Sequence, residues 1–438
     1  MKRRLHLNLF IYGRGHHEAA WRHPRSSSRS LTDIEHWIDC ARTAEAAHFD
    51  SIFLADVLNL PPDVDSSARL WLEPLTALGA IAHATSRIGL IGTASTSHTE
   101  PFNLARQFCS LDHISRGRAG WNIVTSFSIA GSRNFGGAGR LSHSERYDKG
   151  EEFVQVVKAL WNSWRDDAVV DDRQHGVYIR KDRIREIAHK GANFEVAGPL
   201  NLPRSPQGWP VLVQAGGSPS GLEFAAMVGE TIFAAQGKRD EAIKFRNAVR
   251  ARMPVHGRDP ELLRILPGLV PIMGATEKEA LEKEKMLNEL LHPAVGIWML
   301  SEQMDFRLYD YPQDGPLPTA EIRATGKAFT PRVVSLLERA DREGLSVHQC
   351  GVLVAASRSH GSVVGTPEQI ADHMQLWLDE GACDGFNIMP AFFHDEFDLF
   401  VDQVVPILQR RGIYRTDYEG TTLRDHLGLP KPRRGAGP

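Results

Sequence analysis

The segment 214–221, with the sequence QAGGSPSG, contains the residues best suited to bind an anion. Gly216 and Gly217 let the backbone come close to a ligand, and Ser218 followed by Pro219 is typical of the first residues of a helix. The N-terminus of a helix presents backbone N–H groups and the positive end of the helix dipole, which both favour a phosphate. The sequence therefore predicts that Gly217 and Ser218 contact a phosphate. The alternative is that Ser218 only caps its own helix.

A second candidate pair is His143 and Tyr147, which lie one helical turn apart in LSHSERYDKGEEF. On a helix these two side chains share one face, so both could reach the same anion or ring. The preceding segment 131–139 is rich in glycine, as expected of a loop that folds over a cofactor. The alternative for His143 and Tyr147 is a solvated helix start.

Polar residues also follow three apolar runs that are typical of buried strands. Asp56 ends SIFLAD, Thr93 lies in IGLIGTAS, and Asn122 lies in GWNIVTS. If these runs are strands of one barrel, their polar ends point into its mouth, where Asp56 and Thr93 could contact a ligand. Alternatively, Asp56 is a turn residue and Thr93 satisfies backbone groups.

His16, His17, Glu18 and His23 raise the question of a metal site. Their spacing matches no recognised ligand pattern such as HExxH, and no second His or Asp group at a later strand end completes the site. The sequence also lacks a GxSxG elbow for a serine nucleophile. We therefore predict no metal; a metal-dependent barrel hydrolase is the alternative that metal analysis would reveal.

Secondary-structure elements must position these residues. The sequence contains eight apolar runs, separated by segments in which apolar residues recur with the period of a helix. Strands buried on both faces of a parallel sheet read as continuous apolar runs. Helix starts are indicated by Thr32, Thr276 and Thr366, each followed three residues later by Glu or Gln. Eight strands that alternate with helices predict an α/β fold, a (β/α)8 TIM barrel with insertions. The runs are 5–12, 51–56, 88–95, 119–126, 210–216, 230–236, 263–273 and 385–390.

The alternative is a doubly wound open sheet, but Gly13 and Gly15 after the first run lack the third glycine of a dinucleotide-binding motif. We expect a single domain over residues 1–428 with insertions near 165–206 and 292–361. The first insertion resembles strands laid over the barrel top, and the second resembles a lid or wall of the pocket. Residues 429–438 have the composition of a flexible tail.

The overall charge excludes several classes of partner. The 438 residues include 51 Lys+Arg and 54 Asp+Glu, which gives a formal charge of -3. Such a balance provides no positive field for nucleic acid or anionic lipid, and no apolar run approaches the roughly 18 residues of a membrane span. Four widely spaced cysteines without a CxxC pair favour reduced thiols, so we expect a cytoplasmic protein.

Specific blocks distributed over nearly the whole chain resemble a known family. The sequence is similar to the bacterial-luciferase-like flavin monooxygenases, in the subgroup of nitrilotriacetate monooxygenase, dibenzothiophene-sulfone monooxygenase and the pristinamycin synthase oxygenase component. His98 in TASTSHTEP departs from the pattern, because members of this family often have tyrosine there. The blocks that carry the resemblance are AWRHP, FLAD, TASTSHTEPFNLAR, GRAGWNIVTSFSIAGSRNFG, HKGANFEVAGPLNLPRSPQG, QAGGSPSG and GACDGFNIMP.

The resemblance implies an oxygenase that uses reduced FMN and O2 to oxidise a small organic molecule, with C–N or C–S cleavage as one outcome. The reduced FMN would come from a separate NAD(P)H-dependent flavin reductase, and the assembly would be a homodimer or homotetramer. By the same resemblance, Asp56 and Thr93 would line the flavin ring and ribityl chain, and His143, Tyr147 and Ser218 would hold the chain and phosphate. Two alternatives are a deazaflavin-dependent oxidoreductase of the same superfamily and a non-catalytic flavin-binding protein.

Overall fold

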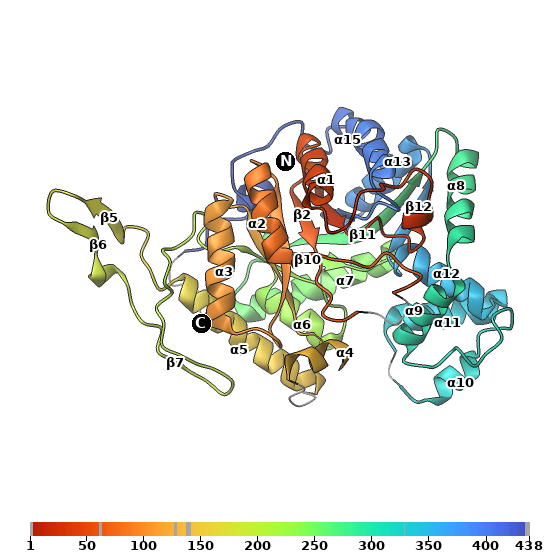
Figure 1. The fold of residues 1–438 in the computed structure, drawn as a ribbon, viewed down its shortest axis with the longest axis horizontal. Coiled ribbons are helices and arrows are strands. Elements are labelled where there is room, and N and C mark those ends of the chain that lie inside the picture. The colour runs from red at the N-terminus through yellow and green to blue at the C-terminus, as the bar shows by residue number, and fades with distance from the viewer. Residues whose placement is uncertain (1–2, 61–63, 127–128, 137–141, 328, 434–438) are drawn as a thin grey trace.

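Eight parallel strands close into a barrel in the computed structural model, which describes residues 3–60, 64–126, 129–136, 142–327 and 329–433 (Figure 1). For Ile129, His143 and Pro331 only the backbone is described. Each strand pairs in parallel with the next, and β1 also pairs with β13, which closes the ring. The predicted (β/α)8 barrel is confirmed. Its strands are β1 (His6–Ile11), β2 (Ser51–Leu54), β3 (Gly89–Ser95), β4 (Ala119–Val124), β9 (Val211–Gln214), β10 (Thr231–Ala234), β11 (Arg264–Met273) and β13 (Gly385–Ile388).

Helices surround the barrel and cover the outward faces of its strands (Figure 1). Thr366 begins α13 with the predicted capping box, and Thr276 caps α8 by accepting a hydrogen bond from the Glu279 amide. The prediction for Thr32 was wrong, because the carboxylate of Asp33 accepts the Glu35 amide and takes the capping position of α1. These helices are α1 (Ile34–Ala46), α2 (Pro74–Ala84), α3 (Pro101–Ile114), α5 (His143–Trp161), α6 (Pro219–Val228), α7 (Arg239–Arg252), α8 (Glu277–Leu290) and α13 (Pro367–Asp379).

The barrel interior and its surroundings form separate cores. Leu7 and Leu9 of β1 point outward into the core shared with the helices, whereas the intervening Asn8 bonds to Ser51 and Asn387 of the neighbouring strands. This alternation follows from the period of two along a strand. The interior is filled mainly by apolar side chains from several strands, namely Phe10, Phe53, Ile91, Val211, Val213, Phe233 and Leu266.

A short C-terminal helix, α16 (Leu423–Leu427), seals the amino end of the barrel. Gly89 and Gly120 leave the space that Leu423 fills, since a Cβ at Gly89 would lie 2.4 Å from Leu423 Cδ1 and one at Gly120 would lie 3.2 Å from Leu423 Cδ2. The buried Arg424 anchors the same helix through two hydrogen bonds to the Glu230 carboxylate, at 2.7 and 2.9 Å. The strands can therefore present a ligand site only at their carboxyl ends.

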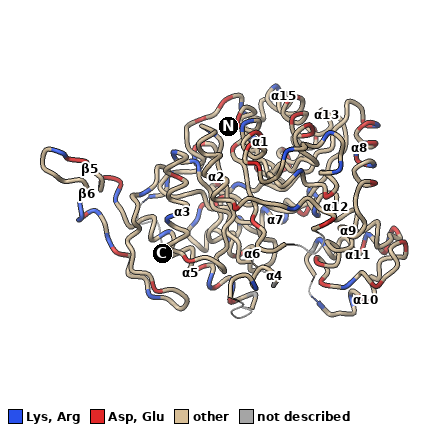
Figure 2. Tube along the Cα trace, in the orientation of Figure 1, with Lys and Arg blue, Asp and Glu red and all other residues tan. Residues whose placement is uncertain are grey.

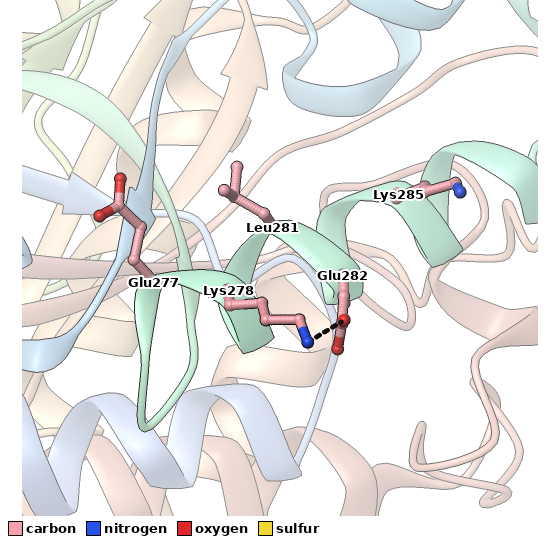
Figure 3. Close-up of a pocket in the computed structure, with 5 residues that line it drawn as sticks. All are labelled: Glu277, Lys278, Leu281, Glu282 and Lys285. Carbon is pink, nitrogen blue, oxygen red and sulfur yellow. Dashed lines mark ion pairs between the residues drawn. The ribbon is translucent and has the colours of Figure 1, made fainter.

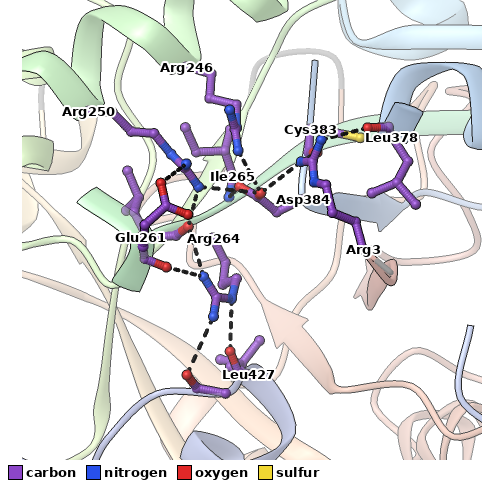
Figure 4. A network of polar contacts seen from close by, with 12 residues as sticks. Arg3, Arg246, Arg250, Glu261, Arg264, Ile265, Leu378, Cys383, Asp384 and Leu427 are labelled. Atoms are coloured by element: carbon purple, nitrogen blue, oxygen red, sulfur yellow. Dashed lines mark hydrogen bonds and ion pairs between the residues drawn. The ribbon is translucent and has the colours of Figure 1, made fainter. Parts of the chain in front are cut away.

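Figure 4 shows a polar network at the amino ends of β11 and β13. Asp384, which precedes β13, accepts from the Ile265 amide at 3.0 Å and from Arg246 of α7 at 3.1 Å. Arg3 and Arg250 also donate to the same carboxylate, at 3.2 and 3.4 Å. One buried aspartate thus joins the N-terminal segment, α7 and two barrel strands.

The segment 165–206 forms two antiparallel hairpins, β5 (Val169–Asp172) with β6 (Val177–Ile179), and β7 (His189–Lys190) with β8 (Glu195–Val196). The first hairpin projects away from the barrel (Figure 1). The segment joins the end of α5 to the start of β9, so it leaves from the amino end of the barrel. The expectation that its strands lie over the barrel top was therefore wrong, although the strands themselves are present.

The segment 292–361 forms a helical lobe with its own apolar core (Figure 1). Its helices are α9 (Pro293–Met304), α10 (Thr319–Ala324), α11 (Pro331–Glu343) and α12 (Val347–Ser357). Gly296 and Gly351 let α9 and α12 approach closely, because a Cβ at Gly296 would lie 3.0 Å from the Gly351 carbonyl carbon. After the lobe, β12 (Gly361–Gly365) pairs with the second half of β11 and leads into α13. Ala19, from the loop after β1, is buried in the lobe core and connects the lobe to that loop.

The last residues pack partly against the barrel. After β13 the chain forms α14 (Asp395–Leu399) and α15 (Val405–Arg410), and beyond α16 Leu429 is buried in the interior core. The Pro432 carbonyl accepts a hydrogen bond from Arg204, so part of the predicted tail is packed.

Figure 2 shows charged residues of both signs spread over the described chain, with neither sign gathered in one part of it. Within the described residues, no helix combines the length and the apolar character that crossing a membrane requires.

Candidate functional site

Tyr147 and Ser218 come together at the start of α6. Ser218 caps this helix by accepting the Gly221 amide at 3.0 Å. A Cβ at Gly221 would lie 3.1 Å from Ser218 Oγ, 3.2 Å from the Tyr147 hydroxyl and 3.3 Å from the Gly216 carbonyl carbon. The absence of a side chain at Gly221 therefore lets the Ser218 and Tyr147 hydroxyls and the backbone meet closely at a helix N-terminus. Two neighbouring hydroxyls beside a helix N-terminus suit a phosphate, which gains from hydroxyl donors and the helix dipole.

Thr93 and Asn122 form a second polar group, inside the barrel. Asn122 of β4 donates to Thr93 Oγ1 of β3 at 2.9 Å, and the two residues are register partners. Both are more than nine-tenths buried, and the Asn122 Oδ1 atom has no hydrogen-bond partner within the described part of the chain. A buried unpartnered amide oxygen costs free energy unless a ligand satisfies it.

The two groups belong to one arc across neighbouring strand ends. Gly150, one turn after Tyr147 on α5, faces the ends of β3 and β4, since a Cβ there would lie 3.4 Å from Thr96 Oγ1 and 3.1 Å from Thr125 Cγ2. The Tyr147 ring packs edge-on against Phe224 of α6, with centroids 5.7 Å apart. Helices α5 and α6 therefore place the hydroxyl pair beside the mouth that Thr93 and Asn122 line.

The remaining predicted residues are less closely connected to this arc. Asp56 lies half-buried just beyond β2, where burial and then the nearby Glu73 raise the pKa of its carboxyl group. Gly217 is exposed and has open space where a Cβ would stand. The backbone of His143 begins α5, but its side chain lies outside the described residues.

A buried charged cluster lies on the side of the mouth formed by the loop after β1. The Glu18 carboxylate contacts Arg358, and Arg69 lies 3.1 Å from it. The Arg358 guanidinium lies 3.8 Å from the centroid of the Tyr12 ring, and Arg69 lies 4.4 Å from that of Trp298 in the lobe. These contacts connect the loop to the lobe. With one carboxylate and two guanidinium groups, the cluster has a formal charge of one positive unit.

The histidines of the mouth are held in the neutral form. Burial, reinforced by Arg358, lowers the pKa of His16 well below its ordinary value, and burial lowers the pKa of His17. The pKa of His360 falls to about 3 through burial and neighbouring arginines. His98, which stacks on Phe135 with ring centroids 4.7 Å apart, also has a pKa lowered by burial. At neutral pH these rings are uncharged, so they can accept a hydrogen bond but have little tendency to take up a proton.

The hollow shown in Figure 3 has no part in this site. Its lining comes from a single exposed helix, α8, and includes the ion pair between Lys278 and Glu282 at 3.7 Å. One helix face cannot enclose a ligand, whereas pockets usually bury most of theirs. The lining residues are Glu277, Lys278, Leu281, Glu282 and Lys285.

Comparison with known proteins identifies the protein family to which this barrel belongs. Residues 14–383 match the profile of the family described as luciferase-like monooxygenase, which covers most of the chain. The chain belongs to the luciferase-like monooxygenase family. The predicted resemblance and the enzyme class, a flavin monooxygenase, are confirmed.

Relatives within the family are similar over nearly their entire length. The chain is 45% identical to the N-acetyl-S-(2-succino)cysteine monooxygenase of Bacillus subtilis (strain 168) and 42% identical to nitrilotriacetate monooxygenase component A of Aminobacter aminovorans, and in both cases 98% of each chain is covered.

Solved structures agree with the sequence relatives. EDTA monooxygenase from Chelativorans sp. BNC1 is 35% identical, with a TM-score of 0.83 over 99% of this chain and 100% of that chain. A riboflavin lyase solved with modified FMN and riboflavin is 29% identical, with a TM-score of 0.86 over 98% of this chain and 96% of that chain.

Sequence reasoning missed the residues whose role depends on contacts between distant segments. Gly221 was within the phosphate-binding segment but was not singled out, although a glycine three residues after a capping serine signals a close approach. The pairing of Glu18 with Arg358 joins residues from opposite ends of the chain. No local pattern in the sequence signals this contact.

Proposed function

We propose that the protein is the oxygenase component of a two-component system, which uses reduced FMN and O2 to oxidise a small organic substrate. The observation that carries this proposal is that the Ser218 and Tyr147 hydroxyls meet closely at a helix N-terminus, at the same barrel mouth where the buried Asn122 oxygen has no partner among the described residues. A phosphate-bearing ring cofactor fits this combination. The structure bound to modified FMN among the solved relatives supports FMN rather than another flavin.

In the proposed complex Ser218, Tyr147 and the amides around Gly217 hold the phosphate, with His143 as a further predicted contact. Thr93 and Asp56 lie along the ring and ribityl chain. When bound, reduced FMN supplies the electron pair with which one oxygen atom of O2 enters the substrate and the other becomes water. Asp56, with its raised pKa, can hold a proton near the mouth more readily than an ordinary aspartate.

The loop after β1 and the helical lobe form the substrate side of the proposed pocket. Glu18, Arg69 and Arg358 fix these two segments together and exclude water from that side of the mouth. The neutral His16 and His360 present ring nitrogens without partners in the described residues, so they can accept a hydrogen bond from the substrate.

The proposed partner is an NAD(P)H-dependent flavin reductase, because a family relative is named component A of its monooxygenase, which implies a second component there. The substrate class follows from the relatives that act on succinylated cysteine and nitrilotriacetate, both small polar molecules. We further propose a cytoplasmic, homo-oligomeric enzyme that forms one domain over residues 1–428, with residues 429–438 as its terminal segment.

The deciding experiment is an anaerobic titration of the purified protein with reduced FMN, monitored by absorbance and protein fluorescence. We expect one reduced FMN per chain, bound more tightly than oxidised FMN, and O2 uptake that rises when a substrate of the succinylated thioether class is added. If reduced deazaflavin binds and reduced FMN does not, the protein is a deazaflavin-dependent oxidoreductase instead. Tight binding of FMN without O2 uptake for any substrate would favour a non-catalytic flavin-binding protein.

The double variant Ser218→Ala with Tyr147→Phe tests the phosphate assignment. Removing both hydroxyls deletes charge-assisted hydrogen bonds, which contribute about 1.5–3 kcal/mol each. We expect reduced-FMN affinity to fall at least about tenfold while far-UV circular dichroism stays unchanged. The control is Ser86→Ala, a serine of the α2–β3 loop outside the site. Unchanged affinity in the double variant would contradict the assignment.

A further inference from the structure

Three potential metal ligands from distant parts of the chain meet beside the barrel mouth. His36 and Cys40 lie one turn apart on α1, and His394 precedes α14. One ring nitrogen of each histidine and the Cys40 sulfur all lie within 4.8 Å of one another. His36 and Cys40 are fully buried, whereas His394 is half-buried and opens the cluster towards solvent.

The tautomer of His36 is fixed in the form that binds a metal. Its Nε2 atom lies 2.9 Å from the carbonyl oxygen of Gly13, and because a carbonyl only accepts, Nε2 carries the hydrogen. The lone pair is therefore on Nδ1, which is buried and has no hydrogen-bond partner among the residues described. Metal-bound histidines characteristically donate their second ring N–H to a carbonyl or carboxylate in this way. Burial lowers the pKa of His36 to about 4, so the ring is neutral at pH 7.

Charged groups of both signs surround the cluster. Asp398, one turn after His394 on α14, and Asp39, next to Cys40 on α1, are its acidic neighbours. Arg29 acts on both Cys40 and His36, and Arg14 acts on His36. The donor atoms, rather than the surrounding charges, therefore favour a metal ion at this position.

We propose that His36, Cys40 and His394 bind a zinc ion, with a water molecule as the fourth ligand. A thiolate with two imidazoles is a donor set that selects Zn²⁺ over the oxygen-preferring Mg²⁺ and Ca²⁺. Zn–N and Zn–S bonds of about 2.1 and 2.3 Å place tetrahedral ligand atoms about 3.5 Å apart, so small side-chain rotations close the site. The Cys40 thiol loses one proton to solvent for each ion bound.

The bound ion would join three segments at the mouth. It would connect α1 to the loop after β13, and through Gly13 to the loop after β1 that carries His16 and His17. Backbone hydrogen bonds already run between these loops, from Phe393 to Arg14 at 2.8 Å and from Ser27 to Phe393 at 2.7 Å. The proposed site is structural and independent of the flavin.

The test is a metal titration of the full chain after chelator treatment and removal of the chelator under reducing conditions. We expect one Zn²⁺ per chain, measured by competition with a chromophoric chelator, and a rise in the unfolding temperature. Co²⁺ as a probe should give a near-ultraviolet thiolate-to-metal charge-transfer band and visible bands of tetrahedral intensity. Failure of the wild-type chain to bind Zn²⁺, or a Co²⁺ spectrum without the thiolate band, would overturn the proposal.

Substitutions of the proposed ligands test where the ion binds. Cys40→Ser should abolish the thiolate band and weaken Zn²⁺ binding at least about tenfold, and His394→Gln should weaken it similarly without disturbing the buried core. The matched control is Cys109→Ser, since Cys109 is another fully buried thiol, bonded instead to the Pro203 carbonyl. Equal Zn²⁺ affinity in the wild type and in His394→Gln would exclude this cluster as the site. Reduced-FMN binding should be retained in every variant that folds.

Discussion

At the scale of single residues, the proposed site depends on the missing side chain of a glycine as well as on the side chains that are present. Gly221 lets two hydroxyls and the backbone meet closely, and Asn122 provides an oxygen that has no hydrogen-bond partner among the described residues. Both features were accessible from the sequence only in part. Thr93, Tyr147 and Ser218 could be predicted as site residues because the ends of strands and the starts of helices can be recognised from the local sequence. The close approach of the Tyr147 hydroxyl to Ser218 depends on where α5 lies against α6, which no local pattern specifies.

Gly221→Ala should damage phosphate binding without removing any functional group. The new methyl would stand 3.1 Å from Ser218 Oγ and 3.2 Å from the Tyr147 hydroxyl, closer than ordinary contact, so it would push apart the two hydroxyls proposed to hold the phosphate. We expect reduced-FMN affinity to fall about tenfold, which corresponds to about 1.4 kcal/mol.

Gly79→Ala is the matched control for Gly221→Ala, because Gly79 also lies in a helix and has nothing within 4 Å of its Cβ position. It should leave affinity unchanged and stabilise α2 slightly. Both variants can be compared by anaerobic fluorescence titration. If Gly221→Ala binds reduced FMN as well as Gly79→Ala does, the phosphate lies elsewhere.

At the scale of elements, the barrel depends on polar anchors at the end opposite the site. Burial by itself would raise the pKa of Asp384, but Arg246, Arg250 and the Ile265 amide outweigh this effect and hold the pKa below its ordinary value of 3.8. The carboxylate therefore stabilises the fold. Because the folded pKa is depressed, this stabilisation is complete above pH 3.8 and is lost as the pH falls through the folded pKa.

Asp384→Asn should reduce the free energy of unfolding by about 3 kcal/mol at pH 7, because it leaves buried guanidinium groups without their counter-ion. Urea denaturation measures this difference, which should shrink when the pH is lowered below 3.8. The control is Asp379→Asn, at an exposed position at the end of α13. It should change the free energy of unfolding by no more than about 0.5 kcal/mol. A difference that stays constant into strong acid would show that the charge of Asp384 is not what stabilises the fold.

At the scale of the whole molecule, the fold was predictable because each barrel strand is a continuous apolar run followed by a segment of helical period. The prediction that residues 165–206 lie over the barrel top was wrong because β-branched residues indicate strands but not where those strands lie. Its position between α5 and β9 would have assigned it to the amino end of the barrel. The clusters of Glu18 with Arg358 and of His36 with His394 were beyond prediction, since each joins opposite ends of the chain.

The projecting hairpin of β5 and β6 should contribute to the proposed homo-oligomer. Val169, Val177 and Tyr178 are 41%, 40% and 64% exposed there, an unusual grouping of apolar side chains on a surface. We expect Tyr178→Ser combined with Val177→Ser to lower the sedimentation coefficient while reduced-FMN binding persists.

The control for the hairpin variant is Val255→Ser, which alters an apolar residue that is 84% exposed elsewhere and should leave assembly unchanged. Analytical ultracentrifugation at several protein concentrations distinguishes the two. Identical sedimentation of the hairpin variant and the wild type would place the interface on another surface.

The closure of the barrel has a consequence for its synthesis. β1 is hydrogen-bonded to β13, and the amino end is sealed by Leu423 of α16, so the earliest and latest parts of the barrel depend on each other. While the chain emerges from the ribosome, the first strands form a sheet with an open edge and an unsealed interior, a state prone to wrong pairing. The enzyme therefore becomes a barrel only near the end of translation, and premature termination anywhere before α16 yields a chain that quality control should recognise as unfinished.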